Sequence, residues 1–408
     1  MTLRLMQAGL LLVLAACSRA PSAAAVAARP FTVSEVATFD APWAMDFLPG
    51  TNSALVTEKP GKLWLVDVRT GTKQLVAGVP SVVLTSQGGL LDVIHSPTFA
   101  ADKLVYLTYA EPSANGGSSL ALARARFVQD GSGLRLDDLR VIWRDPEGGR
   151  GGQFGAIVVF APDGRSLFLS SGERQRFTPA QDPNQPLGKI LHLTLDGQPA
   201  PGNPWAGRAG ASGVVVTDPP ANTEAAKRAV GRRVAWPEPN STPAETWTLG
   251  HRNPYGLAFD SAGRLWETEM GPKGGDEVNL ILPGRNYGWP IVSNGDNYDG
   301  VPIPDHRPND GLEAPKLWWN PSISPTSLVI YSGKQFPHWK GSGFIGALSG
   351  QALIRITFDG DTARKADQWD MGARIRFVGE APDGAIYLLE DGPGARLLRL
   401  EPSAQVRR

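Results

Sequence analysis

The sequence is poor in cysteine, and this excludes two ways of stabilising a fold. Its 408 residues contain one cysteine, Cys17, so neither a disulfide framework nor a cysteine-rich metal site is available. A surplus of one charge is also missing, because 40 Lys and Arg residues balance 40 Asp and Glu residues. Nucleic-acid binding needs clustered cations that neutralise phosphates, so this composition argues against a nucleic-acid partner. A hydrophobic fraction of 41% nevertheless excludes wholesale disorder.

The apolar run near the N-terminus is too short to span a membrane. It covers Leu10–Ala16 and ends in small residues before Cys17, a pattern typical of a secretory signal. The letters LAAC that end at Cys17 resemble a bacterial lipobox, in which the cysteine becomes the lipidated first residue. The alternative is an ordinary signal peptide cut after Ala16 or further on. We expect 1–17 to be a signal peptide with its lipobox at Cys17, 18–30 to be a flexible tether, and the exported protein to be periplasmic and lipid-anchored.

No long amphipathic helical pattern occurs, and glycine and proline are frequent instead. The 47 glycines and 35 prolines make up about a fifth of the chain, which is far too many for a helical bundle. Six segments share an apolar strand, a turn rich in Gly, Asp or Pro, and a second strand; they begin at Met45, Leu90, Ile157, Leu257, Leu328 and Val378. We therefore predict an all-β fold, a six-bladed β-propeller of four-stranded antiparallel blades, over residues 31–404.

The turns inside these segments support the prediction. APDG at 161–164 and 381–384, and DSAG at 260–263, match hairpin turns in which glycine adopts a positive φ. A pair of β-sandwiches or a large barrel would be the alternative folds, and the recurring hairpin disfavours both. Residues 201–245 lack periodicity and are rich in Pro, Gly and Ala, so we expect an insertion loop there on one face of the propeller.

The densest group of polar residues lies at 247–290. Its members flank one of the repeated hairpins, and they are His251, Arg252, Asn253, Gly271, Pro272, Asp276, Glu277 and Tyr287. Propellers carry their functional groups on loops around the central channel, which makes such flanking residues candidates for a site. Adjacent carboxylates after a Gly-Pro loop suit a hard cation such as calcium, and a solvated acidic turn explains the same spacing equally well.

A second candidate is the pair Arg374 and Arg376. Because side chains alternate along a strand, both guanidinium groups would lie on one face and could clamp an anion or a polycarboxylate. An ordinary pair of surface arginines is the alternative, and the spacing alone favours that alternative.

One long stretch resembles a known family. The residues LGHRNPYGLAF…GPKGGDEVNLILPGRNYGWP closely resemble the soluble quinoprotein glucose and aldose sugar dehydrogenases, the glucose/sorbosone dehydrogenase family. Further motifs follow the family's order along nearly the whole mature chain: PWAMDFLPG, EKPGKLW, QGGLLDVIHSPTF, AQDPNQPLGKILHLTLDG, NPW, FIGAL and RIRFV. The resemblance implies a six-bladed propeller, in agreement with the repeated hairpin.

The resemblance also implies a reaction. Such enzymes bind pyrroloquinoline quinone (PQQ) over the channel mouth and oxidise the C1 hydroxyl of an aldose to a lactone, with an external electron acceptor. A base takes the hydroxyl proton while hydride passes to the quinone, whose carbonyl is polarised by calcium. A small sugar substrate and the two cofactors, PQQ and calcium, are therefore expected here.

Individual roles follow from the matched motifs. The residues that match contacts to PQQ or to the substrate are Gln87, Arg252, Asn253, Arg374 and Arg376. Gly271 and Pro272 match the carbonyls that hold the cofactor calcium, and Glu277 and Tyr287 match residues of a second, structural calcium site. Glu173 of SSGERQ matches the carboxylate that supports the catalytic base.

Four positions depart from the family pattern. The position of the catalytic histidine is Gln153, and an amide does not titrate near neutral pH, so Gln153 cannot act as imidazole does. The motif's arginine is replaced by Ile157, a quinone-contacting lysine by Ser349, and the Gln or His before the Gly-Pro loop by Met270. The pocket thereby loses one base and two cations. Glu173 is a candidate substitute base.

Three functions are compatible with these residues. The first is an exported, lipid-anchored sugar dehydrogenase that depends on PQQ and calcium. The second is a catalytically degenerate propeller lipoprotein that acts as a binding or scaffold module, because the base, a lysine and an arginine of the motifs are missing. A calcium-dependent lactonase would need a cluster of carboxylates at the channel, and only Asp276 and Glu277 stand together. The family resemblance favours the first.

Overall fold

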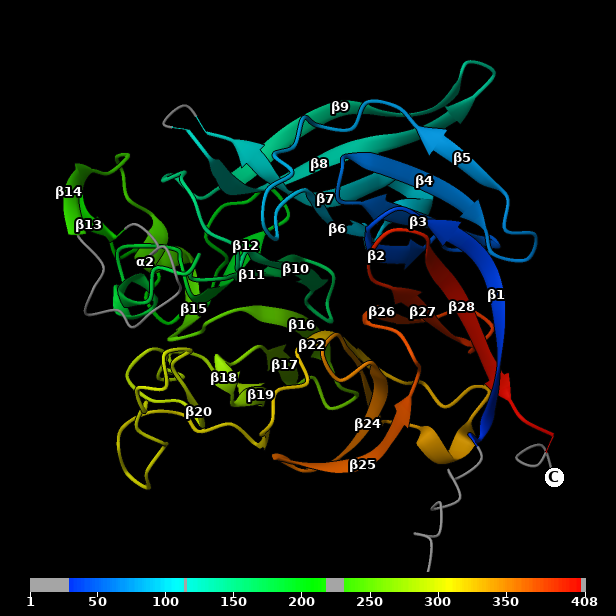
Figure 1. Ribbon diagram of the computed structural model, residues 1–408. Helices are drawn as coiled ribbons and strands as arrows, with labels where there is room; N and C mark the ends of the chain where they lie inside the picture. Colours follow the sequence, from blue (N-terminus) through cyan, green and yellow to red (C-terminus); the bar gives the residue numbers. More distant parts are fainter. Residues whose placement is uncertain (1–28, 114–115, 218–230, 405–408) are drawn as a thin grey trace, which may run out of the picture.

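Six four-stranded antiparallel sheets form a ring in the computed structural model, which describes residues 29–113, 116–217 and 231–404 (Figure 1). The predicted all-β six-bladed propeller is confirmed. The first three blades contain β2 (Pro42–Phe47), β3 (Ser53–Glu58), β4 (Lys62–Asp67) and β5 (Lys73–Val76); β6 (Leu90–His95), β7 (Leu104–Pro112), β8 (Ser118–Asp130) and β9 (Gly133–Arg144); and β10 (Gly155–Phe160), β11 (Ser166–Ser171), β12 (Lys189–Thr194) and β15 (Thr246–Leu249). The last three contain β16 (Pro254–Phe259), β17 (Leu265–Glu269), β19 (Asp276–Ile281) and β21 (Leu317–Trp319); β22 (Pro325–Ile330), β23 (Gly343–Ala347), β24 (Ala352–Asp359) and β25 (Thr362–Asp370); and β26 (Ile375–Glu380), β27 (Ile386–Glu390), β28 (Ala395–Pro402) and β1 (Phe31–Phe39).

The ring is closed by strands from the two ends of the described chain. Strand β1 pairs antiparallel with β28, so that Phe31 lies opposite Pro402 and Phe39 opposite Ala395. In Figure 1 the blue β1 therefore runs alongside the red β28. The sixth blade is completed by residues that precede the first blade, which ties the first and last blades together and leaves the ring no free seam.

The six repeated segments recognised in the sequence are the two innermost strands of each blade. The first strands, β2, β6, β10, β16, β22 and β26, line the central channel and neighbour one another around the ring. Each pairs with the next strand through one irregularity in register near its start. The expected turn chemistry is present, since Gly164 has φ +69°, Gly263 +79° and Gly384 +88°.

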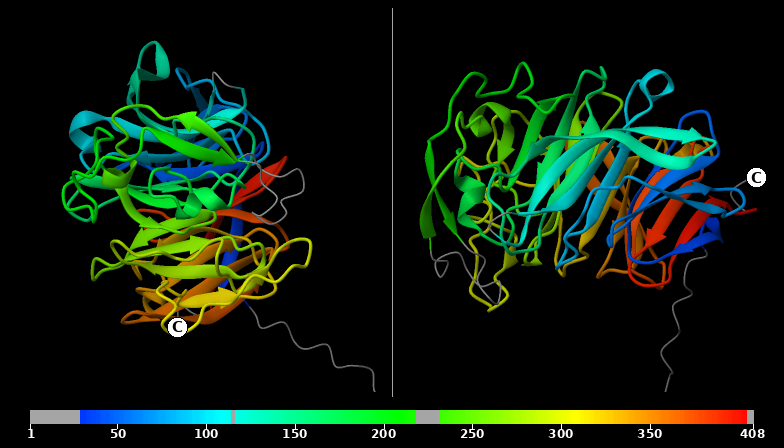
Figure 2. Two further views of the ribbon diagram at one scale, coloured as in Figure 1. Left: turned by 90° about the vertical axis from the view of Figure 1, so that its left-hand side faces the viewer. Right: turned by 90° about the horizontal axis from the view of Figure 1, so that it is seen from above.

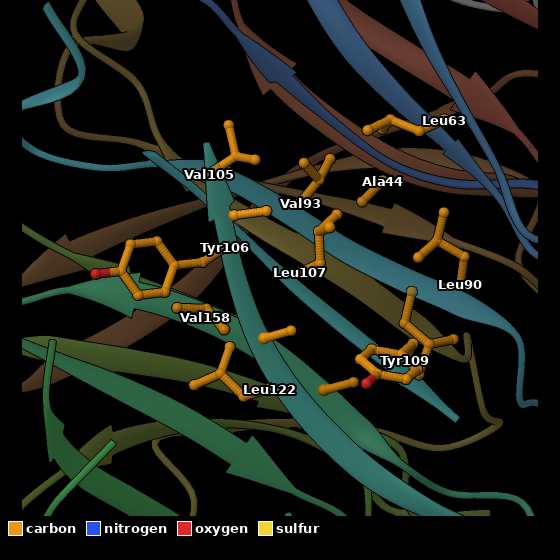
Figure 3. Close-up of a cluster of buried hydrophobic side chains, with 14 of the residues drawn as sticks. Ala44, Leu63, Leu90, Val93, Val105, Tyr106, Leu107, Tyr109, Leu122 and Val158 are labelled. Atoms are coloured by element: carbon orange, nitrogen blue, oxygen red, sulfur yellow. The ribbon is translucent and has the colours of Figure 1, made fainter. Parts of the chain in front are cut away.

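The hydrophobic core lies between neighbouring blades. Both faces of a blade are apolar, so each cluster of buried side chains is shared by adjacent sheets. Figure 3 shows one such cluster, in which Leu63 of β4, Leu107 of β7 and Val158 of β10 come from three successive blades. Stacking of this kind buries the sheets and leaves the polar ends of the strands to form the two mouths of the channel.

The region expected as an insertion loop lies between β12 and β15 of the third blade. Its described part contains a two-stranded sheet, β13 (Gly213–Thr217) with β14 (Gly231–Ala235), and the short helix α2 (Thr242–Glu245). This pair lies at the periphery, at the left-hand end of the right panel of Figure 2. Strands β18 (Lys273–Gly274) and β20 (Gly295–Asp296) form a second small sheet.

Helices are few in the described residues. They are α1 (Phe99–Asp102), α2 and the 3-10 turns Thr178–Gln181 and Pro337–Trp339. Within the described ranges, none is long and apolar enough to cross a membrane. Cys17 and the tether up to residue 28 lie outside those ranges, so the expected anchor stays a prediction.

Candidate functional site

The sequence-predicted residues gather at one end of the channel because of strand direction. Gln87, Gln153, Arg252 and Arg374 all lie at or just before the start of an inner strand, and the six inner strands begin at the same end. The second strand of each blade runs antiparallel to the first, so the residues that follow it return to that end. Glu173 follows β11 in this way, and Gly271 follows β17.

Two loops approach closely at the centre of this end. Gly172 makes the approach possible, because a Cβ atom there would lie 2.1 Å from the carbonyl oxygen of Gln153. Both loops also hold non-glycine residues at positive φ, +56° for Gln153 and +60° for each of Arg174, Gln175 and Phe177. Such backbone conformations cost energy and cluster at functional sites, which supports a site between these loops.

Gln153 links the carboxylate of Glu173 to the guanidinium group of Arg252 within this site. Its carboxamide is satisfied in the orientation in which the nitrogen donates to Glu173 Oε1 and the oxygen accepts from Arg252 Nη2 at 2.8 Å. Its backbone N–H donates to Gln87 Oε1 at 2.8 Å, and Tyr255 Oη donates to the same oxygen at 3.0 Å. Gln153 therefore sits at the centre of a network that joins Gln87 to Glu173 and Arg252, and the last two line one small cavity with Gln153.

Glu173 is the titratable group of this network. It is 1% exposed, and burial raises its pKa to about 7 even though Arg252 and the backbone N–H of Phe177 favour the carboxylate. That N–H donates directly to Glu173 Oε2. A carboxyl group with a pKa near neutrality, lining a cavity, is suited to accept a proton.

Arg252 lies between this carboxylate and the Gly-Pro loop. Its Nη1 donates to the carbonyl oxygens of Met270 at 3.0 Å and Gly271 at 2.7 Å, and its guanidinium carbon lies 5.3 Å from the centroid of the Trp289 ring. The backbone N–H of Arg252 donates to Glu269 Oε2 at 2.7 Å. One of the carbonyls expected to hold calcium is thus occupied by a guanidinium group.

The predicted arginine pair faces one carboxylate. Arg374 Nε donates to Asp391 Oδ2 at 2.9 Å, and Arg376 Nη2 donates to Asp391 Oδ1 at 2.8 Å. The expectation that alternation places both side chains on one face is met. Lys59, which follows β3, belongs to the same group, because burial and then the charges of Arg376 and Arg374 lower its pKa. Three cations surround one carboxylate here.

Lys59 is a residue that our sequence reasoning missed. It stands in the EKPGKLW motif at the end of the second strand of its blade. Glu173 and Gly271 occupy the matching ends of their own blades, so position in the repeat could have singled it out.

The departures from the family pattern lie in two places. Ser349 donates to the carbonyl of Ser322 at 3.2 Å, and its Oγ lies 2.9 Å from Ser324 Oγ, so it fixes a loop on this side of the channel. Ile157 packs among apolar residues of β10 and β6 and lines the opposite half of the channel. Neither replaces the charge of the residue that the family has there.

The adjacent carboxylates Asp276 and Glu277 do not act together. Asp276 Oδ2 accepts from the backbone N–H groups of Ile323 at 2.6 Å and Ser324 at 2.7 Å, and therefore anchors a loop. Glu277 lies on the opposite face of β19, where Asn279 donates to its Oε2 at 3.1 Å. Only Glu277 faces the small cavity that Tyr287 also lines.

Further acidic residues, not singled out in the sequence, surround Glu277. Glu267 and Glu269 project from β17, and together with His251 they offer ligand atoms within 4.8 Å of one another. Burial, and then the charge of Glu269, raises the pKa of both Glu267 and Glu277. Alternation along β17, opposite Glu277 on β19, is the signal that could have identified them.

Tyr287 binds backbone groups with its hydroxyl and packs on His251 with its ring. Its hydroxyl donates to the carbonyl of Leu280 at 2.6 Å and accepts from the N–H of Leu282 at 2.9 Å. Its ring stacks on the imidazole of His251 with centroids 4.6 Å apart. His251 is fully buried, with Nε2 2.9 Å from Thr248 Oγ1 and Nδ1 3.3 Å from Glu269 Oε1, and so is not positioned as a base at the channel mouth.

Comparisons with known proteins agree on one family. The model of the glucose / sorbosone dehydrogenase family matches residues 39–218 and 235–399. The chain is 34% identical to aldose sugar dehydrogenase YliI of Escherichia coli over 370 residues, which cover 89% of this chain and 90% of that protein. The apo crystal structure of the soluble aldose sugar dehydrogenase of E. coli is similar with a TM-score of 0.78 at 32% identity, covering 91% and 100% of the two chains. The PQQ-bound aldose sugar dehydrogenase of Streptomyces coelicolor is similar with a TM-score of 0.67 at 28% identity, covering 91% and 98%.

Proposed function

The chain belongs to the glucose/sorbosone dehydrogenase family, and from this premise we propose that it is an oxidoreductase that converts an aldose to its lactone at C1 with PQQ as cofactor. The observation that carries the proposal is the network of Gln153, Glu173 and Arg252 at a channel mouth that also holds a surplus of cations. A carboxyl group with a pKa near 7 is suited to remove a proton, and several fixed positive charges are suited to bind an anionic cofactor.

The residues present fit the charge of PQQ. PQQ is a tricarboxylate. Among the described residues Arg374 and Arg376 both pair with Asp391, and Lys59 interacts electrostatically with all three, so this group of three cations and one carboxylate can bind further anionic oxygens. Arg252 lies on the other side of the mouth, with Nη2 directed to Gln153. When bound, PQQ supplies a quinone carbon that accepts hydride from the sugar. The arginines would hold it by its carboxylates, and Trp289 lines the small cavity beside Glu173 and Arg252.

Glu173 is the proton acceptor in this proposal. As a carboxylate it takes the proton of the C1 hydroxyl through its Oε1, while Gln153 orients it and separates it from Arg252. Gln153 is accordingly a positioning residue. His251 is already held by Thr248 and Glu269, which leaves Glu173 as the titratable group of the Gln153 network.

Calcium fits one of its two expected places better than the other. Glu269 and Glu277 line a small cavity together with Tyr287. Close to it, Glu267 Oε1 and Asn279 Oδ1 are buried and have no hydrogen-bond partner among the described residues. These oxygen atoms suit a hard divalent cation. The carbonyl of Gly271 instead accepts a hydrogen bond from Arg252 Nη1, and the positive charge of this guanidinium group disfavours a second cation there.

A catalytically degenerate propeller is the second candidate. The substitutions that favour it are Gln153 for the catalytic histidine and Ser349 and Ile157 for two cations. In that case the mouth would bind PQQ or a related anion without turning over a sugar.

A spectral titration distinguishes the two. The purified protein receives PQQ with and without calcium, and the quinone absorbance is followed before and after a panel of aldoses. The dehydrogenase predicts a saturable spectral change and then reduction of the quinone by at least one aldose. Binding without reduction by any aldose would support the degenerate propeller. No saturable binding would contradict the dehydrogenase and leave a propeller with a different ligand.

The cellular place of the protein is part of the proposal. The lipobox-like LAAC ending at Cys17, in a chain with one cysteine, supports an exported, periplasmic lipoprotein. An enzyme in that place passes its electrons to an external acceptor.

A further inference from the structure

A cavity of about 540 Å³ occupies the opposite half of the channel. All six inner strands contribute to it, through their middle and carboxyl-terminal residues, and the turn after β26 and the loop after β22 form its rim. It therefore lies at the end away from Gln153 and Glu173, on the same strands but with different side chains.

Two carboxylates and an imidazole form the polar wall of this far cavity. Asp92 is 7% exposed, and its oxygens accept from the backbone N–H groups of Val93 at 2.9 Å and Val158 at 2.8 Å. Burial, with a smaller contribution from the charge of Asp46, raises the pKa of Asp92 to about 7 although the two backbone N–H donors lower it. Asp46 Oδ2 is itself 2.7 Å from both the N–H and the Nδ1 of His95. Two carboxyl groups thus lie close enough to interact electrostatically in the wall of this cavity.

The rim adds one charge of each sign. Glu380 accepts from the backbone N–H of Ser332 at 2.8 Å, and Lys334 Nζ donates to the carbonyl of Pro382. Across the lining, three carboxylates are opposed by one lysine and by the titratable His95. The far cavity is therefore suited to a positive ligand.

The remaining wall is aliphatic. Its side chains come from five different blades and include Val93, Val158, Leu257, Leu328 and Val378. A bare divalent cation needs several oxygen ligands around it, and in the described part of the chain the group of three side chains able to share a metal is at the other end, at His251. A ligand with an apolar body and a single charged nitrogen can pack on the aliphatic side chains and pair with the carboxylates at the same time.

We propose that the far cavity is a second binding site, for a small organic cation. The charged nitrogen lies against Asp46 and Asp92, and the apolar part of the ligand packs on the aliphatic side chains of the inner strands. The site is independent of the proposed dehydrogenase activity and of PQQ.

The test uses two probes of the same shape. Benzylamine, a cation at pH 8, and benzyl alcohol, its neutral counterpart, are titrated into the purified protein by calorimetry. We expect saturable binding of benzylamine at least about tenfold tighter than that of benzyl alcohol, because only the amine can pair with the carboxylates. Equal affinity for the two probes, or no saturable binding of the amine, would overturn the proposal.

Variants locate the site. Asp92→Asn should weaken benzylamine about tenfold and leave benzyl alcohol unchanged, whereas Asp361→Asn, an exposed carboxylate on the turn between β24 and β25, should change neither. If Asp92→Asn does not fold, Asp46→Asn takes its place with the same expectation. Unchanged amine affinity in the variant that folds would place the binding elsewhere and refute the proposal.

The pH dependence provides a further check. Benzylamine should bind more tightly at pH 8 than at pH 6, because burial raises the pKa of Asp92 to about 7 and a larger share of this carboxyl group is ionised at pH 8. Asp46, His95, Glu380 and Lys334 also line the cavity, and loss of a proton from His95 would change the affinity in the same direction. Tighter binding at pH 6 would contradict the assignment of the polar wall.

Discussion

At the end of the channel where the inner strands begin, Lys59, Arg374 and Arg376 share a single carboxylate. At the end where the same strands finish, Asp46, Asp92 and Glu380 are opposed by Lys334 and by the titratable His95. The strands themselves carry Arg376 at one end and Asp46, Asp92 and Glu380 at the other, while their remaining side chains pack against neighbouring blades. The comparison teaches that a propeller determines the positions of the residues along its channel and leaves their charge free to differ from one end to the other.

The two ends also differ in what burial does to a carboxyl group. Asp391 lies between two guanidinium groups, and although burial raises its pKa, the arginines lower it overall. Asp92 has only backbone N–H donors and a second carboxylate near it, so burial dominates and its pKa is about 7. Glu173 resembles Asp92 in this respect, although it lies at the cationic end.

Replacing the proton acceptor should have the largest effect. Glu173→Gln keeps the shape of the side chain but removes its ability to accept a proton, so sugar oxidation should fall by about 10²- to 10⁴-fold while PQQ still binds. In the unmodified protein, turnover should decline as the pH falls below about 7, because Glu173 becomes protonated.

Two controls accompany this measurement. Asp361→Asn, on an outer turn, should leave turnover unchanged. Gln153→His introduces an imidazole beside Glu173 and should raise turnover. Full activity in Glu173→Gln would show that another group takes the proton.

How far the sequence alone leads differs between the fold and the site. The hairpins that begin at Met45 and Val378, and their turn glycines, predicted the propeller because they are local patterns of strand and turn. The closure of the ring by β1 on β28 pairs residues at opposite ends of the chain, and no local pattern contains that pairing.

The sequence predicted which residues form the Gln153 network better than it predicted the contacts between residues. Resemblance placed Arg252, Glu173 and Gln153 together, and they form one network. Sequence adjacency suggested that Asp276 and Glu277 act as a pair, yet strand alternation turns them to opposite faces. Asp92 drew no notice in sequence, because its role depends on burial against strands from other blades.

Removing cations should have an intermediate effect. Arg376→Gln and Lys59→Met each delete a positive charge from the cationic end, and PQQ affinity should fall about tenfold to a hundredfold for each. The quinone absorbance titration measures this without turnover. Lys103→Met, which removes an exposed lysine on the turn between β6 and β7, serves as the matched control and should bind PQQ as the unmodified protein does. Equal affinity in all three variants would show that charge at this end does not hold the cofactor.

The effect expected at the acidic end is on the pH dependence of stability, and it leaves turnover and PQQ binding unchanged. Asp92 has a folded-state pKa of about 7 against 3.8 as its ordinary value, so between these pH values the folded state binds more protons than the unfolded state. Its contribution to the free energy of unfolding is therefore complete below pH 4 and is lost as the pH rises towards 7, by at most about 1.4 kcal/mol per pH unit.

Asp92→Asn should abolish this loss. Urea unfolding is measured at pH 5, 6 and 7. As the pH increases, the free energy of unfolding of the variant should rise relative to that of the unmodified protein. The loss of the oxygen that accepts from Val158 adds a cost that does not change with pH. Asp361→Asn should keep the original slope, because that carboxylate is 73% exposed and gains nothing from burial. A difference between Asp92→Asn and the unmodified protein that stays constant with pH would mean that Asp92 is solvated like a surface carboxylate. The contrast in burial between the two ends of the channel would then fail, whereas the contrast in charge would stand.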